Sequence, residues 1–267
     1  MNAAILGHLL RQNALRLLAV VAALTVWGTL MPIIYSAFGQ QLADIIAQFP
    51  AMEQFMRFGG GDMFSLPGTI AVGYIHPFAI ALLAVFAIAL PLSWVAGERQ
   101  RGTLEVVLAR PISRNRYYLT LLVATTFLTG LAMAATLLGT VIATAAVGLL
   151  DQLDMANLPA LWLNGLLLYF AIAAITLAAS VSFDRLAPAA GIVLAIVLIS
   201  YFLQVLGSLW PDAEWLQPYS LFHYLDPMST LQEGVQLVDL GLLLTVSAVA
   251  VVYALIVFPR RDLAAPA

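Results

Sequence analysis

The chain has 267 residues, of which 63% are hydrophobic and only 9% are charged, and its formal net charge at pH 7 is −3. Soluble domains contain about 45–50% apolar and about 25% charged residues, so this composition excludes an ordinary water-soluble protein and predicts one membrane domain, residues 1–267, whose apolar excess faces lipid. The sequence has no cysteine and no lysine, which excludes disulfides, thiolate metal sites and a phosphate-binding loop with a Gly-Lys-Ser/Thr end.

The residues before the first long apolar stretch have an amphipathic pattern. From Asn2 to Arg16, the apolar side chains Ile5, Leu9 and Leu10 are separated from the polar ones. This pattern fits a short N-terminal helix that lies in the membrane interface. The alternative is an early start of the first span.

Six segments reach the roughly 20 mainly apolar residues that a spanning helix needs. They cover residues 15–38, 69–94, 117–148, 159–180, 188–209 and 237–258. The first is longer than the apolar region of a signal peptide and lacks a small-x-small cleavage site, so we expect an uncleaved span. The third is about 48 Å long by helix rise, so we expect it to project beyond the lipid or to be broken. The sequence therefore predicts an all-α integral membrane fold with six transmembrane helices.

The basic residues fall almost entirely on one side of these spans. All 11 are arginines, and only Arg57 lies on the other side. By the positive-inside rule, both termini, the loop 96–116 and the short turn at Asp184 and Arg185 are predicted to be cytoplasmic. The arginines on that side are Arg11, Arg16, Arg99, Arg101, Arg110, Arg114, Arg116, Arg185, Arg260 and Arg261.

Ionisable groups are rare inside the predicted spans. No span carries Asp, Glu or Arg near its middle, which disfavours a proton- or sodium-coupled carrier because that cycle needs a titrating group. His76, directly before Pro77, is the titratable exception. Two interpretations remain: His76 satisfies backbone groups at a kink, or it lines a translocation path.

The third predicted span carries a stripe of threonines along one helical face. Thr129, Thr136 and Thr140 are candidates for a polar translocation path, with Thr125 and Thr144 on the same stripe. The alternative is close helix packing, in which the hydroxyls bond to their own helix backbone.

Two segments on the opposite side are too long to be simple turns. Residues 40–66 mix apolar and acidic positions before three glycines at 59–61, which predicts an amphipathic helix followed by a hinge. Residues 210–236 are rich in aromatic side chains and predict re-entrant or interfacial helices before the last span. An ordinary aromatic belt at the membrane interface is the alternative for this second segment.

The cytoplasmic loop between the second and third spans contains the pattern of a short helix. Thr103 is placed to cap its N-terminus, Glu105 suits the positive end of the helix dipole, and Pro111 stops it. Its apolar positions share one face by i, i+3, i+4 spacing: Leu104, Val107 and Leu108. With little over one turn of apolar surface, this helix cannot stand alone. We therefore expect it to dock on another surface and to serve as a handle for a soluble partner.

The run from Glu98 to Arg114, with Gly-Thr-Leu-Glu at 102–105 and Pro-Ile-Ser at 111–113, resembles the stretch between the second and third spans of ABC type-2 permeases. In that family this stretch contains the coupling helix, which sits in a cleft of a separate ATPase subunit. The topology extends the resemblance over the whole chain, although Leu221 replaces a proline that the family has before its last span. The resemblance implies docking on the ATPase through Glu98, Arg99, Arg101, Gly102, Thr103, Leu104, Glu105, Val107, Leu108, Pro111 and Arg114.

The same resemblance implies the permease subunit of an ATP-driven exporter. It implies a homodimer or pseudodimer of permeases with two ATPase subunits, ATP and Mg²⁺ bound by those partners, and no cofactor, metal, nucleic acid or catalytic residue in this chain. Abundant alanine and arginine without lysine indicate a GC-rich bacterial genome, so the expected location is the bacterial cytoplasmic (inner) membrane. The substrate is not identified by the sequence.

Two other classes of function compete with this one. An ATP-independent membrane carrier or a signalling subunit would have the same spans. An intramembrane enzyme would need catalytic side chains at matched membrane depth. Only His76 and Ser208 are candidates for that role, and Ser208 lacks the Gly-x-Ser-Gly pattern of rhomboid-like proteases.

Overall fold

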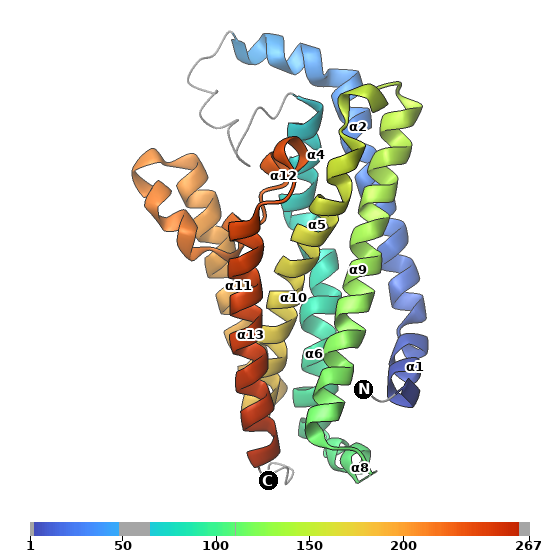
Figure 1. The fold of residues 1–267 in the computed structure, drawn as a ribbon, viewed down its shortest axis with the longest axis vertical. Helices are drawn as coiled ribbons and strands as arrows, with labels where there is room; N and C mark the ends of the chain where they lie inside the picture. The colour runs from blue at the N-terminus through green and yellow to red at the C-terminus, as the bar shows by residue number, and fades with distance from the viewer. Residues whose placement is uncertain (1–2, 48–64, 110, 262–267) are drawn as a thin grey trace.

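The computed structural model describes residues 3–47, 65–109 and 111–261. These residues form helices and no strand, and six helical segments are long and apolar enough to cross a membrane (Figure 1). The second span is made of several short helices, and the other spans are α2 (Ala14–Ala47), α9 (Arg114–Ala146), α10 (Leu158–Ser182), α11 (Leu186–Leu209) and α13 (Leu237–Arg260). The six predicted spans and the all-α membrane fold are confirmed.

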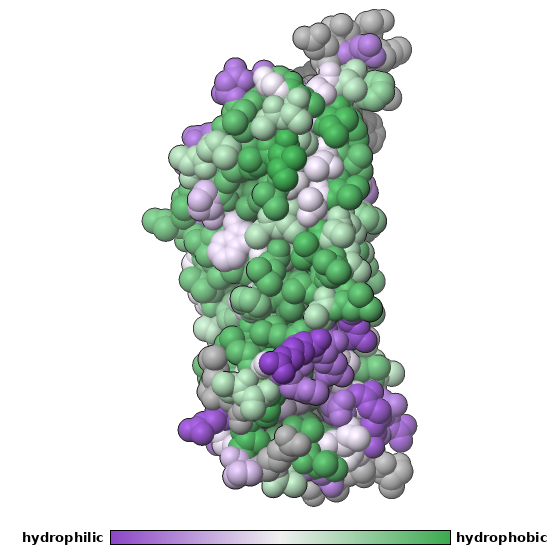
Figure 2. All heavy atoms as spheres, turned by 90° about the vertical axis from the view of Figure 1, so that its right-hand side faces the viewer, coloured by the Kyte–Doolittle hydropathy of each residue, from purple (hydrophilic) through white to green (hydrophobic). Residues whose placement is uncertain are grey.

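One end of the molecule carries both termini. They lie at the lower end of Figure 1, together with α8 (Leu104–Leu108). Figure 2 shows a broad hydrophobic face on which hydrophilic side chains gather near this lower end. On α2, Leu15, Leu18 and Val26 are 78%, 64% and 60% exposed. Apolar side chains this exposed along a span belong in hydrocarbon and not in water.

The N-terminal residues form a separate helix, α1 (Ala3–Gln12), directly below α2 in Figure 1. Asn13, which is 1% exposed, lies at the junction. Its Nδ2 donates to the carbonyl of Leu9 at 2.8 Å, and its Oδ1 accepts from Arg16 at 3.1 Å. The N–H of Leu17 donates to the Asn13 carbonyl at 2.8 Å, so the backbone hydrogen bonding of the first span continues across the junction. The separate helix is as predicted, and its place in the membrane interface stays a prediction.

The second span is broken at Pro77. A proline has no N–H, so in a continuous helix the carbonyl of Gly73 would lose its partner four residues later. The indole Nε1 of Trp27, on α2, donates to that carbonyl at 2.8 Å instead. His76 has extended backbone (φ −68°, ψ 138°), and its Nδ1 accepts from the N–H of Phe78 at 3.2 Å. The structural interpretation of His76 as part of a kink is therefore correct.

The lower half of the same span contains two π-helical stretches around Pro91. π-helical turns are common where a proline or a side chain interrupts the helix ladder. Two carbonyls here accept from neighbouring spans: Pro91 from the Ser180 hydroxyl at 3.5 Å and Trp94 from the Tyr117 hydroxyl at 3.0 Å. The whole span consists of α4 (Leu66–Ile75), α5 (Pro77–Ala84), η1 (Val85–Ala89), α6 (Leu90–Leu92), η2 (Ser93–Gly97) and α7 (Glu98–Gln100).

The third span, α9, is one unbroken helix of 33 residues, so of the two expected alternatives the break does not occur, and projection beyond the lipid stays a prediction. Its backbone lies very close to that of α2. A Cβ added to Gly28 would be 2.2 Å from the carbonyl oxygen of Thr136, and one added to Gly139 would be 2.2 Å from that of Thr25. The two helices therefore meet through glycines, as small residues allow in membrane helix pairs.

The segment before the last span folds back onto the helix bundle. It contains η5 (Pro211–Tyr219), η6 (Leu221–Tyr224) and α12 (Pro227–Glu233). The hydroxyl of Ser220 donates to the Ser200 carbonyl of α11 at 2.7 Å, and Asn164 of α10 donates to the Tyr224 carbonyl at 2.8 Å. The predicted helices are thus packed on protein, although Trp215 remains 66% exposed. The other long segment begins within α2, and its predicted hinge at 59–61 lies outside the described residues.

The close contact between α2 and α9 predicts that a single added methyl group is harmful there. Gly28→Ala or Gly139→Ala should lower the free energy of unfolding by about 1–3 kcal/mol, because overpacking at a backbone contact forces the helices apart. Gly191→Ala and Gly241→Ala are matched controls, since nothing lies within 4 Å of a Cβ at either position. Thermal denaturation of the detergent-solubilised protein measures the difference. Equal stability of both pairs of variants would contradict the packing.

Candidate functional site

Between the second and third spans, α7 and α8 are joined by a tight turn at Gly102. The N–H of Gly102 donates to the Arg99 carbonyl at 2.9 Å, and the N–H of Thr103 donates to the Glu98 carbonyl at 2.9 Å. This pair of bonds is the Schellman motif, which ends a helix in a left-handed residue. Gly102 has φ of 72°, a conformation that favours glycine. Gly102 therefore sets the direction in which α8 leaves α7.

The polar side chains of this turn bind one another. The Glu98 carboxylate accepts from the Arg101 guanidinium at 2.5 Å and also from the Thr103 hydroxyl. Thr103 is the N-cap residue of α8, yet its side chain accepts no hydrogen bond from the helix. The predicted capping role is wrong, because Thr103 has helical and not extended backbone (φ −87°, ψ −19°) and its hydroxyl is directed to Glu98.

The apolar face of α8 packs on the protein's own core. Leu104 is 1% exposed, and Val107 and Leu108 pack against the same core. This face was expected to dock on a partner; Leu104 is buried within the chain, whereas Val107 and Leu108 are only half-buried, so docking through this face stays a prediction. The opposite face carries the exposed Glu105 and Val106, the latter 70% exposed. Any partner would therefore meet Glu105 and Val106 first.

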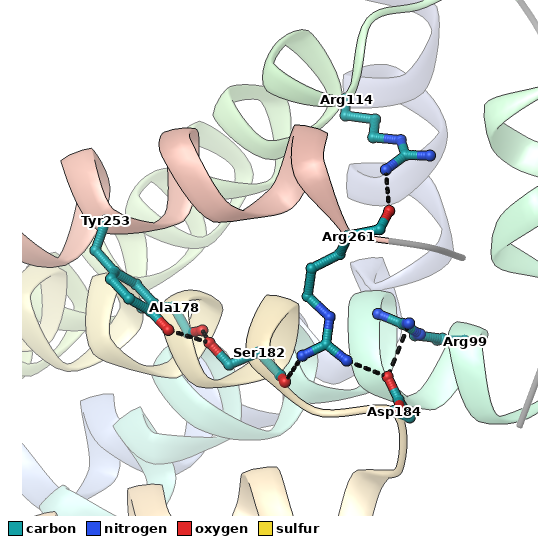
Figure 3. Close-up of polar contacts among 7 residues, drawn as sticks. All are labelled: Arg99, Arg114, Ala178, Ser182, Asp184, Tyr253 and Arg261. Atoms are coloured by element: carbon teal, nitrogen blue, oxygen red, sulfur yellow. Dashed lines mark hydrogen bonds and ion pairs between the residues drawn. The ribbon is translucent and has the colours of Figure 1, made fainter. Parts of the chain in front are cut away.

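Helix α7, which precedes α8 in the chain, is attached to the turn between α10 and α11. Arg99 is 5% exposed, and its Nη2 lies 2.8 Å from Oδ1 of Asp184. Figure 3 shows that Arg99 and Arg261 approach this carboxylate from two sides. The side-chain Oε1 of Gln100 accepts from the N–H of Leu186, the first residue of α11, at 2.8 Å. Two consecutive residues of α7 thus hold both sides of one turn.

The end of α13 completes this polar cluster. Arg261 lies 2.5 Å from Asp184 and also donates to the Ser182 carbonyl at the end of α10. Arg114, at the start of α9, donates to the carbonyls of Phe258 at 3.1 Å and of Arg261 at 2.5 Å. We call Arg99, Gln100, Arg114, Ser182, Asp184 and Arg261 the end cluster, of which Figure 3 draws all members except Gln100.

The residues predicted to dock on a partner therefore divide into two groups. Arg99, Leu104 and Arg114 fix the segment to the spans, whereas Arg101 and Glu105 are exposed, and the ion pair of Arg101 is with Glu98 of the segment itself. Helix α8 ends at Leu108, three residues before Pro111, which was predicted to stop it. Docking of this segment on an ATPase stays a prediction.

The pairing of Asp184 with two arginines was not predicted from the sequence. Asp184 was identified only as part of a short turn, Arg261 only as one of the arginines on the same side of the spans, and Gln100 was not singled out. Arg261 and Asp184 are 77 positions apart. A contact of this kind leaves no local pattern in a single sequence, and the gathering of the arginines on one side of the predicted spans is a feature that could have pointed to it.

The threonine stripe of α9 is a packing surface in this structure. Thr129, Thr136 and Thr140 are 1%, 2% and 1% exposed. The hydroxyls of Thr136 and Thr140 donate to the carbonyls four residues earlier, at 3.4 and 3.0 Å. The observed burial agrees with the packing alternative. His76, in contrast, is exposed and lies with its ring 4.8 Å from that of Trp27, and its role in a translocation path stays a prediction.

The end of the molecule opposite α8 carries titratable groups with structural contacts. Burial, and to a lesser extent the nearby Asp239 carboxylate, raises the pKa of Tyr224 above its ordinary value. The Tyr224 hydroxyl donates to the Pro218 carbonyl at 2.7 Å, so it connects η6 to η5.

Throughout the described ranges, no three His, Cys, Asp or Glu side chains gather as metal ligands would. The end cluster and α8 are therefore the candidate functional site.

Comparison with known proteins places this geometry in a family. A family model described as "ABC-2 family transporter protein" matches residues 6–263. The match includes all six spans, the end cluster and α8. No curated protein matches the chain.

Proposed function

Because the chain belongs to the ABC-2 family of transporter proteins, we propose that it is the permease of an ATP-driven exporter and docks on a separate ATPase subunit through α8. Membership makes it a membrane-spanning component of an ABC transporter, and the resemblance of residues 98–114 to such permeases is confirmed at the level of the family. Three parts of this function are proposed: export as the direction of transport, docking through α8, and the subunit composition.

The exposed outer face of α8 supports the docking proposal. The inner face is fixed to the spans by Leu104, so the helix has a rigid base. Val106 is 70% exposed on the other side, with Glu105 and Arg101 as charged neighbours. An apolar side chain surrounded by polar ones, on a helix outside the membrane spans, is the composition of a small protein contact. In the ABC-2 family, the partner expected at such a contact is a soluble ATPase subunit.

The proposal assigns ATP binding to a partner subunit, because this chain lacks the lysine of the ordinary phosphate-binding loop. Without lysine it cannot build the phosphate-binding loop that holds ATP, so ATP and Mg²⁺ are assigned to two ATPase subunits. A second copy of the permease completes a homodimer, and the unidentified substrate passes through the membrane part of that assembly. The proposed location is the bacterial inner membrane, and the arginine distribution supports a cytoplasmic position for α8 and both termini.

The proposed orientation can be measured directly, because the chain contains no native cysteine. Arg185→Cys, in the exposed turn between α10 and α11, should react with a membrane-impermeant thiol reagent only from the cytoplasmic side. Asp212→Cys, in η5, should react only from outside. The reagent would be applied to intact cells and to inverted membrane vesicles. Reaction of both positions from the same side would exclude the orientation.

The docking proposal predicts that Val106→Asp separates assembly from membrane insertion. Burying an apolar side chain contributes about 1.5–3 kcal/mol, and a buried carboxylate adds a desolvation cost. At about 1.4 kcal/mol per tenfold change, affinity for the ATPase should fall about tenfold to 150-fold. Co-purification of a candidate ATPase subunit co-expressed with this chain, with membrane yield measured in parallel, tests this expectation.

Val235→Asp is the matched control for this experiment. Val235 is 48% exposed and lies between α12 and α13, next to the start of α13, whereas Arg261 of the end cluster follows the other end of that helix. The same substitution there should leave co-purification unchanged. If both variants retain the ATPase, the docking face is assigned wrongly. If the unaltered chain neither retains an ATPase nor changes its rate of ATP hydrolysis, the proposed function itself fails.

A further inference from the structure

Three helix ends meet at the turn that contains Asp184. Helix α10 ends at Ser182, α11 begins at Leu186, and Arg261 directly follows α13. The Asp184 carboxylate accepts from Arg261 at 2.5 Å and from Arg99 of α7 at 2.8 Å. One side chain thus connects the end of the second span with the ends of the fourth, fifth and sixth.

The two sides of the Arg99–Asp184 pair differ in exposure. The Arg99 side chain is 5% exposed, whereas that of Asp184 is 47% exposed. Removal of the carboxylate would take the counter-ion from a buried guanidinium, which is far more costly than breaking a surface ion pair. The contact is therefore expected to persist when neighbouring parts of the protein move. The bond from the Leu186 N–H to Gln100 reinforces it on the other side of the turn.

A second connection joins the start of α9 to the end of α13. Arg114 donates to the carbonyls of Phe258 and Arg261, which belong to the last turn of α13 and the residue after it. Carbonyls at a helix C-terminus lack partners within the helix, and a cation there is favoured by the helix dipole. Since α8 lies between α7 and α9 in the chain, both of its flanks are fixed to the same cluster.

We propose that Asp184 is a positioning residue, which ties the α7–α8 segment to the adjoining ends of α10, α11 and α13 so that a displacement of α8 moves these ends as one unit. The inference rests on the proposed function, because the displacement is supplied by the ATPase. The turn at Gly102 and the contacts of Glu98 make α7 and α8 one compact element. Force applied to the exposed face of α8 therefore reaches Arg99, and through Asp184 it reaches three further spans.

The test uses the complete permease–ATPase complex in lipid nanodiscs. The rate of ATP hydrolysis in the complex is compared with that of the ATPase alone, and co-purification is measured on the same samples. Asp184→Asn should leave co-purification unchanged, because the outer face of α8 is intact. The permease-dependent change in hydrolysis should fall at least about fivefold, the lower range of a typical coupling between sites.

Two variants separate positioning from a general structural effect. Asp184→Glu keeps the carboxylate and should retain most of the permease-dependent change in hydrolysis. Arg185→Gln removes a charge from an exposed residue of the same turn and should behave as the unaltered chain. Loss of coupling in Asp184→Asn together with retention in these two variants supports the proposal. An unaltered rate in Asp184→Asn overturns it, as does loss of co-purification, which would place Asp184 in docking or folding.

Arg261→Gln extends the test to a variant that keeps the buried pair intact. This variant removes the contacts that the Arg261 side chain makes with Asp184 and Ser182, while Arg99 keeps its carboxylate partner. If Asp184→Asn does not accumulate in the membrane, this variant decides the question. A normal complex with reduced coupling supports the proposal, and a normal complex with full coupling overturns it. Failure of the unaltered chain to bind or affect the ATPase would refute the proposed function instead.

Discussion

The absence of water from the bilayer core governs the shape of this protein, because every backbone polar group there must find a partner within the chain. The second span shows how this requirement is met when a helix is interrupted. Pro77 removes one donor, and Trp27 of another span supplies a replacement for the Gly73 carbonyl. Near Pro91, side chains of α9 and α10 contact the carbonyls of the π-helical region. A broken helix thus becomes a fixed part of the bundle, held by its neighbours.

The all-α membrane fold could be predicted from the sequence because it depends on local composition. Twenty apolar residues mark a span wherever they occur, and Pro77 marks a kink in any helix. The surroundings of the apolar face of α8 could not be predicted in this way. Spacing places Leu104, Val107 and Leu108 together, but it cannot distinguish burial in the chain's own core from burial in a partner. Arg99 presents the same difficulty, since its counter-ion comes from a distant turn.

The candidate site combines two kinds of surface on one short segment. The inner side of α7 and α8 is bound to the spans by Leu104 and Arg99, while Val106 on the outer side is open. A segment that transmits force needs both surfaces, because a helix that bound only the partner would move without displacing the membrane spans. The glycine turn between α7 and α8 gives the segment a defined shape without added length.

The glycine contact between α2 and α9 has a consequence for how the protein is made. These two helices are the first and third spans, and the broken second span separates them in the chain. Much of α2 is otherwise exposed, so its main packing partner is synthesised two spans later. The first span therefore enters the bilayer before the surface that fits its glycines exists, and until α9 has emerged only the second span, through contacts such as Trp27 with Gly73, can pack against it.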